Sequence, residues 1–119
     1  MGLTHIAVTI RNRDSNQTFS GKFLVDTGST DSMVPAGELK RIGITPIGKK
    51  TYELASGALE EFEISYAEFS FLDERIVGRV IFGPDNTEPI LGVIALESMG
   101  VIVDPVNQTL KKLPALPLK

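Results

Sequence analysis

Alternation of apolar and polar residues runs along most of the chain and predicts a protein built from β-strands. In the first strand Ile6, Val8 and Ile10 share one face, which is typical of a half-buried strand. In a later strand the alternation changes phase near Ala67, as a bulge would cause. Strands are predicted over residues 3–10, 18–25, 49–54, 59–71, 75–83 and 90–91, with a strand–turn–strand unit over 101–110.

Two short stretches have the pattern of helices rather than strands. Residues 35–43 begin with proline, carry apolar residues three positions apart and end on glycine. Residues 93–99 suit a second short helix that Gly100 closes. The expected fold class is therefore all-β: a mostly antiparallel, closed β-barrel-like domain with one or two short helices.

Length, charge and composition narrow the chemistry that is available. The 119 residues support one domain, spanning residues 1–119. The chain has no cysteine and a single histidine, His5, which we expect to be an exposed strand residue. Thiolate and histidine metal sites are thereby excluded within one chain, and carboxylate chemistry remains. The net charge of −3 argues against nucleic acid as a partner. No apolar run is long enough to span a membrane and no signal peptide is visible, so we expect a cytoplasmic protein without a membrane partner.

The most informative stretch is residues 23–30, Phe-Leu-Val-Asp-Thr-Gly-Ser-Thr. An apolar run delivers the carboxylate of Asp26 into a turn rich in hydroxyl groups, where Gly28 can allow a close backbone approach. On these residues alone an ordinary turn after a strand is the favoured explanation, because Asp and Gly are common turn residues.

Residues 23–29 resemble the active-site turn of the aspartic proteases, and Ile90, Leu91 and Gly92 resemble the second hydrophobic-hydrophobic-glycine motif that packs beneath it. The hairpin between these motifs occupies the place of the family's flap. The order and spacing are most similar to the single-domain, retropepsin-like members, in which two identical chains build one site. The resemblance extends from the first strand to the turn after Val103 and implies a pepsin- or retropepsin-like fold.

The resemblance implies an aspartic endopeptidase that needs neither metal nor cofactor. Two carboxylates that share one proton can activate water and protonate the substrate carbonyl. The chain has a single Asp-Thr-Gly, so Asp26 would meet its own copy across the two-fold axis of a homodimer. Thr27 would hydrogen-bond across that axis and Gly28 would leave its backbone free to approach substrate. Ser29 would donate to the Asp26 carboxylate and lower its pKa.

The expected substrate is an extended peptide or protein, bound as an added strand. The flap tip, Ala55, Ser56, Gly57 and Ala58, would close over it and exclude water. Candidate pocket residues are Val34, Ile81 and Ile90.

Some features depart from the retroviral pattern. An ion pair of those enzymes falls here on Thr30 and Val93, so both of its charges are missing. Pro114 and Pro117 cannot donate ladder hydrogen bonds, which limits how the C-terminal tail could contribute to a dimer. Two alternatives remain: a non-catalytic peptide-binding or dimerisation module on the same scaffold, and a monomeric β-barrel that binds a small ligand in an apolar cavity.

Overall fold

The structure is a computed structural model that describes residues 4–104, 106–107 and 109–118. Its elements lie close to the predicted ones. The structure contains one further strand that the sequence pattern does not predict, β3. It has four residues, too few for an alternation of apolar and polar positions to be recognised. The elements are β1 (His5–Arg11), β2 (Thr18–Val25), β3 (Ser32–Pro35), α1 (Ala36–Arg41), β4 (Gly48–Glu53), β5 (Leu59–Phe71), β6 (Glu74–Gly83), β7 (Ile90–Leu91), α2 (Val93–Met99), β8 (Val101–Asp104) and β9 (Thr109–Lys112).

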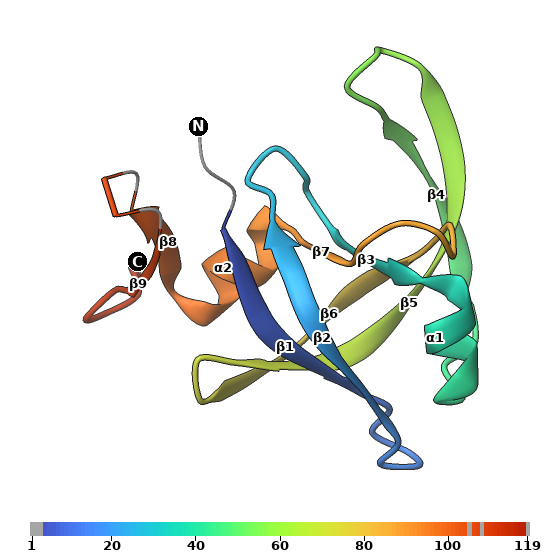
Figure 1. Cartoon of the computed structure of the whole chain (residues 1–119), viewed down its shortest axis with the longest axis horizontal. Coiled ribbons are helices and arrows are strands. Elements are labelled where there is room, and N and C mark those ends of the chain that lie inside the picture. The colour runs from blue at the N-terminus through green and yellow to red at the C-terminus, as the bar shows by residue number, and fades with distance from the viewer. Residues whose placement is uncertain (1–3, 105, 108, 119) are drawn as a thin grey trace.

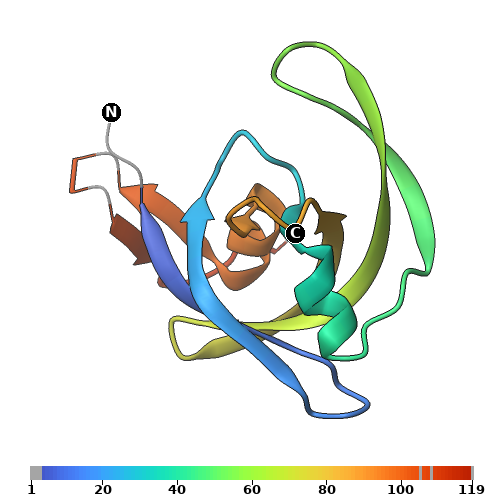
Figure 2. The ribbon, with the colours of Figure 1, turned by 45° about the vertical axis from the view of Figure 1, so that its right-hand side comes forward.

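Strands β1 to β7 form one sheet in the order β1-β2-β7-β3-β6-β5-β4. A further pairing of β1 with β5 closes six of these strands into a ring, and β4 continues outward beside β5 as a long hairpin (Figures 1 and 2). Most pairings are antiparallel, but β2–β7 and β3–β6 are parallel. The predicted fold class is confirmed as mostly β with two short helices.

The core fills the inside of this ring. It contains the predicted face of the first strand, with Val8 and Ile10 buried and Ile6 packed against them. The largest fully buried side chains also include Phe23, Phe69 and Leu91. Such burial of aromatic and aliphatic side chains is the main stabilising contribution to a domain of this size.

The phase change in β5 is present in the burial pattern but is not caused by a bulge. The register with β6 runs without interruption from Ile64, opposite Ile81, to Phe71, opposite Glu74. The pattern changes because the second face of β5 is also covered along part of its length: Ile64 is buried there, and Glu68 lies under Arg11.

The two helices are capped in different ways. Pro35 precedes α1 and provides no side-chain cap; instead the carboxylate of Asp85, in the loop after β6, accepts a hydrogen bond from the amide of Gly37 at 2.6 Å. Helix α2 ends at Gly100, whose φ of 73° is the left-handed conformation that glycine adopts without penalty. Both ends therefore follow known capping chemistry.

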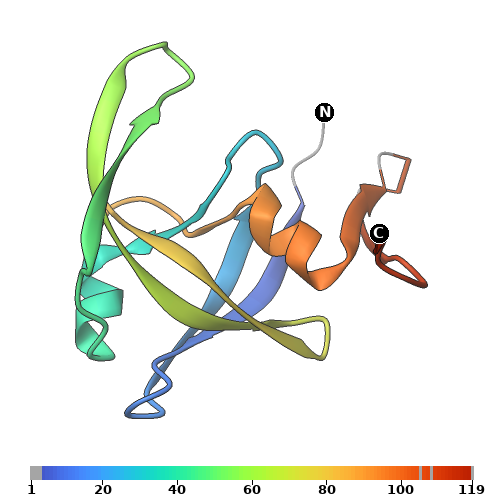
Figure 3. The ribbon, with the colours of Figure 1, turned by 180° about the vertical axis from the view of Figure 1, so that it is seen from behind.

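Strands β8 and β9 form a separate two-stranded sheet beyond α2 (Figure 3). Lys112 of β9 pairs with Glu74 of β6 at 3.1 Å, which links this small sheet to the end of the β5–β6 hairpin. The amide of Leu113 donates to the carbonyl of Gly100, so the tail folds back onto the end of α2. Within the described ranges, no helix has the length and apolar character needed to cross a membrane. The single-domain span and the cytoplasmic location stay predictions.

Candidate active site

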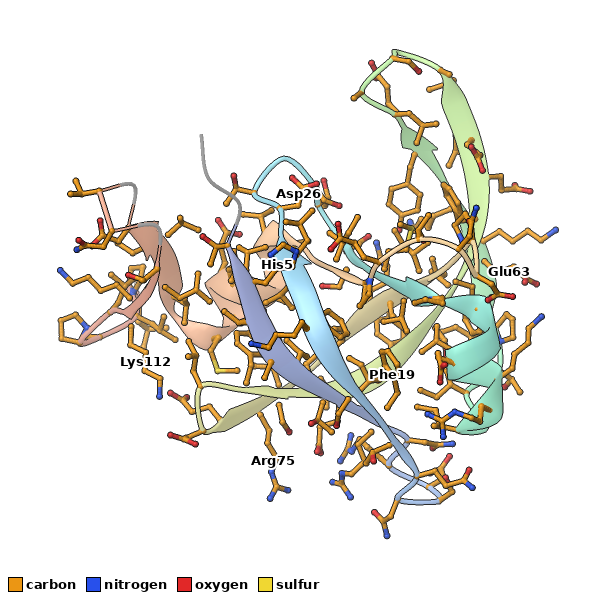
Figure 4. All side chains as sticks on the ribbon, in the orientation of Figure 1. His5, Phe19, Asp26, Glu63, Arg75 and Lys112 are labelled. Carbon is orange, nitrogen blue, oxygen red and sulfur yellow. The ribbon has the colours of Figure 1, made fainter. Side chains whose placement is uncertain are left out.

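Asp26 lies directly after β2, at the start of an exposed loop (Figure 4). Its amide donates to the carbonyl of Leu91 at 3.0 Å, which ties the start of the turn to β7. One carboxylate oxygen accepts a hydrogen bond from the amide of Gly28 at 3.0 Å, and the carbonyl of Asp26 accepts one from the amide of Ser29 at 3.1 Å. Asp26 is half-buried and Thr27 beside it is exposed. The turn thus presents one oriented carboxylate at the surface.

The motif Ile90, Leu91 and Gly92 lies beneath this turn. Strand β7 runs parallel to β2, with Leu91 opposite Val25. The chain then enters α2. At the start of this helix the amide of Val93 donates to the carbonyl of Ser29 at 2.8 Å, and the amide of Ile94 donates to the carbonyl of Thr30 at 3.1 Å. The two motifs, which are far apart in sequence, therefore form one hydrogen-bonded unit.

A cleft of about 780 Å³ opens in front of Asp26, between the turn and the β4–β5 hairpin. The described residues that line it combine apolar walls with hydroxyl and acidic groups, and none of them is Lys, Arg or His. They are Asp26, Gly28, Ser29, Thr30, Met33, Thr51, Tyr52, Glu53, Leu54, Ala55, Glu60, Phe62, Ile81, Pro84, Thr87 and Ile90. A cleft with this lining can hold an extended chain with apolar side chains.

Of the predicted pocket residues, Ile81 and Ile90 line the cleft, but the prediction for Val34 is wrong. Val34 is fully buried in the core, and its neighbour Met33 faces the cleft instead. Side chains alternate between the faces of a strand, so an error of one residue in β3 exchanges a core position for a cleft position.

The β4–β5 hairpin projects from the sheet at the same end of the molecule as the loop that follows β2 (Figures 1 and 3). Its tip turns at Gly57, which has a φ of 88° and donates its amide to the carbonyl of Leu54. Ala55 lines the cleft, whereas Ser56, Gly57 and Ala58 are exposed at the tip and outside the lining. In one chain the tip therefore touches the cleft only through Ala55.

A buried polar cluster behind the turn was not predicted from the sequence. Asp31 is only 3% exposed, and its Oδ2 accepts hydrogen bonds from the hydroxyl of Tyr52 at 2.7 Å and from Nη1 of Arg79 at 3.2 Å. Burial, followed by the bond to Asp31, raises the pKa of Tyr52 to about 12. A hydrogen bond that Arg79 donates to Tyr66, and then the Asp31 carboxylate, raise the pKa of Arg79 further above its already high value. The three residues come from segments far apart in sequence, so no local motif signals them.

The expected bond from Ser29 to the Asp26 carboxylate is not formed. The Ser29 hydroxyl donates instead to the carbonyl of Asp31 at 2.9 Å, so it stabilises the loop rather than the charge of Asp26. Thr30 and Val93 stand where the retroviral enzymes have an ion pair. Here both residues bind the other segment through backbone atoms: the carbonyl of Thr30 accepts from Ile94, and the amide of Val93 donates to Ser29.

His5 is exposed, as predicted, and its Nε2 lies 3.0 Å from a carboxylate oxygen of Glu88. No group of three or more His, Asp or Glu side chains within the described part of the chain is arranged to hold a metal ion. The chemistry that the described residues of the cleft offer is that of a carboxylate.

Comparison with known proteins agrees with this geometry. The sequence profile described as "Aspartyl protease" matches residues 6–93. A search of curated protein sequences gave no match.

Three solved structures have a similar fold at low sequence identity. The solution structure of the simian foamy virus (mac) protease has a TM-score of 0.57 and 16% identity, covering 78% of this chain and 91% of that one. The EIAV protease in complex with the inhibitor HBY-793 has a TM-score of 0.60 and 19% identity, covering 83% and 89%. The foamy viral protease–reverse transcriptase in complex with an RNA/DNA hybrid has a TM-score of 0.56 and 15% identity, covering 77% of this chain and 11% of that longer one.

The structural matches show that the ring of strands is the retropepsin-like fold. The sequence profile covers well over half of the chain and includes the turn, the hairpin and the second motif. This chain belongs to the aspartyl protease family.

Proposed function

We propose that the protein is an aspartic endopeptidase whose active site forms between two identical chains, with Asp26 of each chain supplying one carboxylate. The observation that carries this proposal is the environment of the carboxylates. Asp26 is oriented at the cleft by its own turn. The other described carboxylates of the lining, Glu53 and Glu60, belong to the hairpin, and Asp31 is occupied by Tyr52 and Arg79. The second member of a dyad therefore has to come from another copy.

The dyad would act through one shared proton. Two carboxylates a few Å apart cannot both ionise easily, so one is a base and the other an acid at the same pH. The ionised Asp26 would take a proton from a water molecule as that water attacks the peptide carbonyl. The protonated Asp26 would donate to the carbonyl oxygen, and proton return to the leaving amine would complete hydrolysis.

Surface features of the turn support the assembly. Thr27, beside Asp26, is exposed, so the side chain of Thr27 is available for contact with a second copy. The loop carrying Asp26 and the tip of the β4–β5 hairpin lie at the same end of the molecule in opposite views (Figures 1 and 3). A partner docked at that end would bring two turns and two hairpins around one cleft.

Within this proposal the hairpin is the flap and an extended peptide is the substrate. The peptide would lie between the turn and the hairpin, with its apolar side chains toward Met33, Ile81 and Ile90. The tip residues 55–58, which are exposed in one chain, would approach the substrate on closure.

The test is cleavage of a mixed peptide library between about pH 3 and 7.5, a range that brackets carboxylate pKa values, at several protein concentrations. Asp26→Asn is compared with Asp73→Asn, which makes the same change at an exposed turn between β5 and β6. We expect cleavage that rises faster than linearly with wild-type protein, is lost in Asp26→Asn and persists in Asp73→Asn. Cleavage that survives Asp26→Asn contradicts the proposal. A folded dimer that binds peptide without cleaving it would instead identify the non-catalytic binding module.

A further inference from the structure

The hairpin and the active-site loop are joined by one side-chain hydrogen bond to a buried charge. Tyr52 lies on β4, two residues before Leu54, where the turn of the tip begins. Its hydroxyl donates to Oδ2 of Asp31 at 2.7 Å, and Asp31 is in the loop between Asp26 and β3. The bond therefore joins the hairpin to the active-site loop behind the cleft, since Tyr52 lines the cleft and Asp31 does not.

The lower end of this link is held rigidly. Asp31 is only 3% exposed, and Arg79 of β6 binds the same carboxylate oxygen. The carbonyl of Asp31 accepts a hydrogen bond from Ser29, and Gly92 packs against its backbone. A buried carboxylate costs free energy unless hydrogen-bond donors satisfy it. Loss of the Tyr52 hydroxyl would remove one of the donors to Asp31, so the bond is favoured in the folded chain.

The upper end is held by packing within the hairpin. The ring of Tyr52 meets the ring of Phe62 edge-on, with centroids 6.0 Å apart, and both rings line the cleft. Tyr52 lies opposite Glu60 in the antiparallel register, so its position is coupled to both strands of the hairpin. Tyr52 of β4 is thus fixed within the hairpin by its contacts with β5.

We propose that Tyr52 is a positioning residue: its hydroxyl bond to the buried Asp31 carboxylate holds the hairpin at a fixed height above Asp26 and sets how closely it covers a bound peptide. The effect of Tyr52 on catalysis rests on the proposed protease function. The anchoring itself depends only on the contacts within one chain, and it can be measured without any activity.

The first experiment measures NMR amide relaxation along the hairpin in the wild type and in Tyr52→Phe, which removes the hydroxyl and keeps the ring against Phe62. We expect increased motion for residues 50–60 and unchanged relaxation for β8 and β9. Thr51→Val is the matched control, because it removes a hydroxyl from the neighbouring residue of β4 and leaves the bond between Tyr52 and Asp31 in place. Unchanged hairpin relaxation in folded Tyr52→Phe overturns the proposal, as does an equal increase in Thr51→Val.

The second experiment separates substrate binding from the chemical step. Tyr52→Phe is expected to lower kcat/KM about tenfold, mainly through KM, which is the scale of one hydrogen bond to a charged group. Because Tyr52 acts through Asp31, the double variant with Asp31→Asn should lose no more than Asp31→Asn alone. Fully additive losses, or a loss confined to kcat, contradict the anchoring role. If neither the wild type nor the variant cleaves peptides but the hairpin relaxation changes as expected, the anchor stands and the protease function fails.

Discussion

Gly92 lies so close to the backbone of Asp31 that a β-carbon added to Gly92 would be 2.6 Å from both the carbonyl carbon and the carbonyl oxygen of Asp31. The φ of Gly92 is −90°, which any residue can adopt, so the requirement for glycine is steric and not conformational. The second motif thus needs glycine because the active-site loop passes directly over it.

Gly92→Ala is therefore expected to destabilise the protein at the upper end of the 1–3 kcal/mol that is usual for overpacking, because the obstruction is backbone that cannot rotate away. Urea unfolding measures the change. Gly48→Ala is the matched control, since a β-carbon at Gly48 would meet nothing within 4 Å. Equal unfolding midpoints for the two variants would show that the loop moves aside easily.

Adjacent residues of β3 are expected to respond to substitution in opposite ways. Val34 is fully buried, so Val34→Ala should lower the free energy of unfolding by about 2 kcal/mol and leave substrate preference unchanged. Met33 lines the cleft, so Met33→Ala should change which apolar side chains are cleaved best, with a smaller effect on stability. Peptide-library profiling beside urea unfolding distinguishes the two. A change of preference in Val34→Ala would contradict the placement of these side chains.

Met33 and Val34 also show which features cannot be predicted from the sequence. Local signals gave the strands, both helices and the turn, because alternation, capping residues and the Asp-Thr-Gly motif act over a few residues. Short β3 carries too few residues to fix which face points inward, so its sequence does not show that Met33, and not Val34, lines the cleft. The cluster of Asp31, Tyr52 and Arg79 forms only when three segments that are distant in sequence come together. The hydroxyl of Ser29 donates to the carbonyl of Asp31 and not to the carboxylate of Asp26. Tertiary contacts of this kind leave no periodic pattern.

Stability in acid is expected to depend on Glu68 of β5. Arg11 donates through Nε and Nη2 to the two carboxylate oxygens of Glu68 at 2.8 and 2.7 Å, and this hydrogen bonding lowers the pKa of Glu68 below its ordinary value of 4.5. The unfolded chain binds the proton more readily, so this contribution is present above about pH 4.5 and is lost as the pH falls through the folded-state pKa. Glu68→Gln should be less stable than the wild type at pH 7 and lose less stability on acidification. Exposed Glu63 provides the control, Glu63→Gln, which should keep the wild-type acid dependence.

Stability in alkali is expected to depend on Tyr52. Its pKa is raised to about 12 from the ordinary value of 10.0, first by burial and then by the bond to Asp31. The folded chain holds this proton where the unfolded chain releases it, so the contribution is complete below pH 10 and is lost as the pH rises from 10 to 12. Tyrosinate absorbance should show a late titration that Tyr52→Phe abolishes. The urea midpoint of Tyr52→Phe should also fall less than that of the wild type between pH 9 and 11.5; equal slopes would contradict the assignment.

Charge in the cleft is expected to favour substrates with basic side chains. Glu60 shares a hairpin face with Tyr52 and Phe62, and the charged groups among the described lining residues are all acidic. A lysine or arginine of the substrate near Glu60 gains Coulomb attraction, and a glutamate there is repelled.

Within the proposed protease function, Glu60→Gln should therefore reduce the preference for lysine over glutamate at one substrate position by about twofold to fivefold, the range of an exposed ion pair. Glu63→Gln changes the net charge equally from the opposite face of the same strand, where Glu63 points away from Asp26 in Figure 4. Paired peptides that differ only in lysine or glutamate, compared at low and high salt, provide the measurement. The preference should weaken with salt, because screening acts on exposed charges. An equal change in Glu63→Gln would mean that overall charge, and not the position of Glu60 in the cleft, sets the preference.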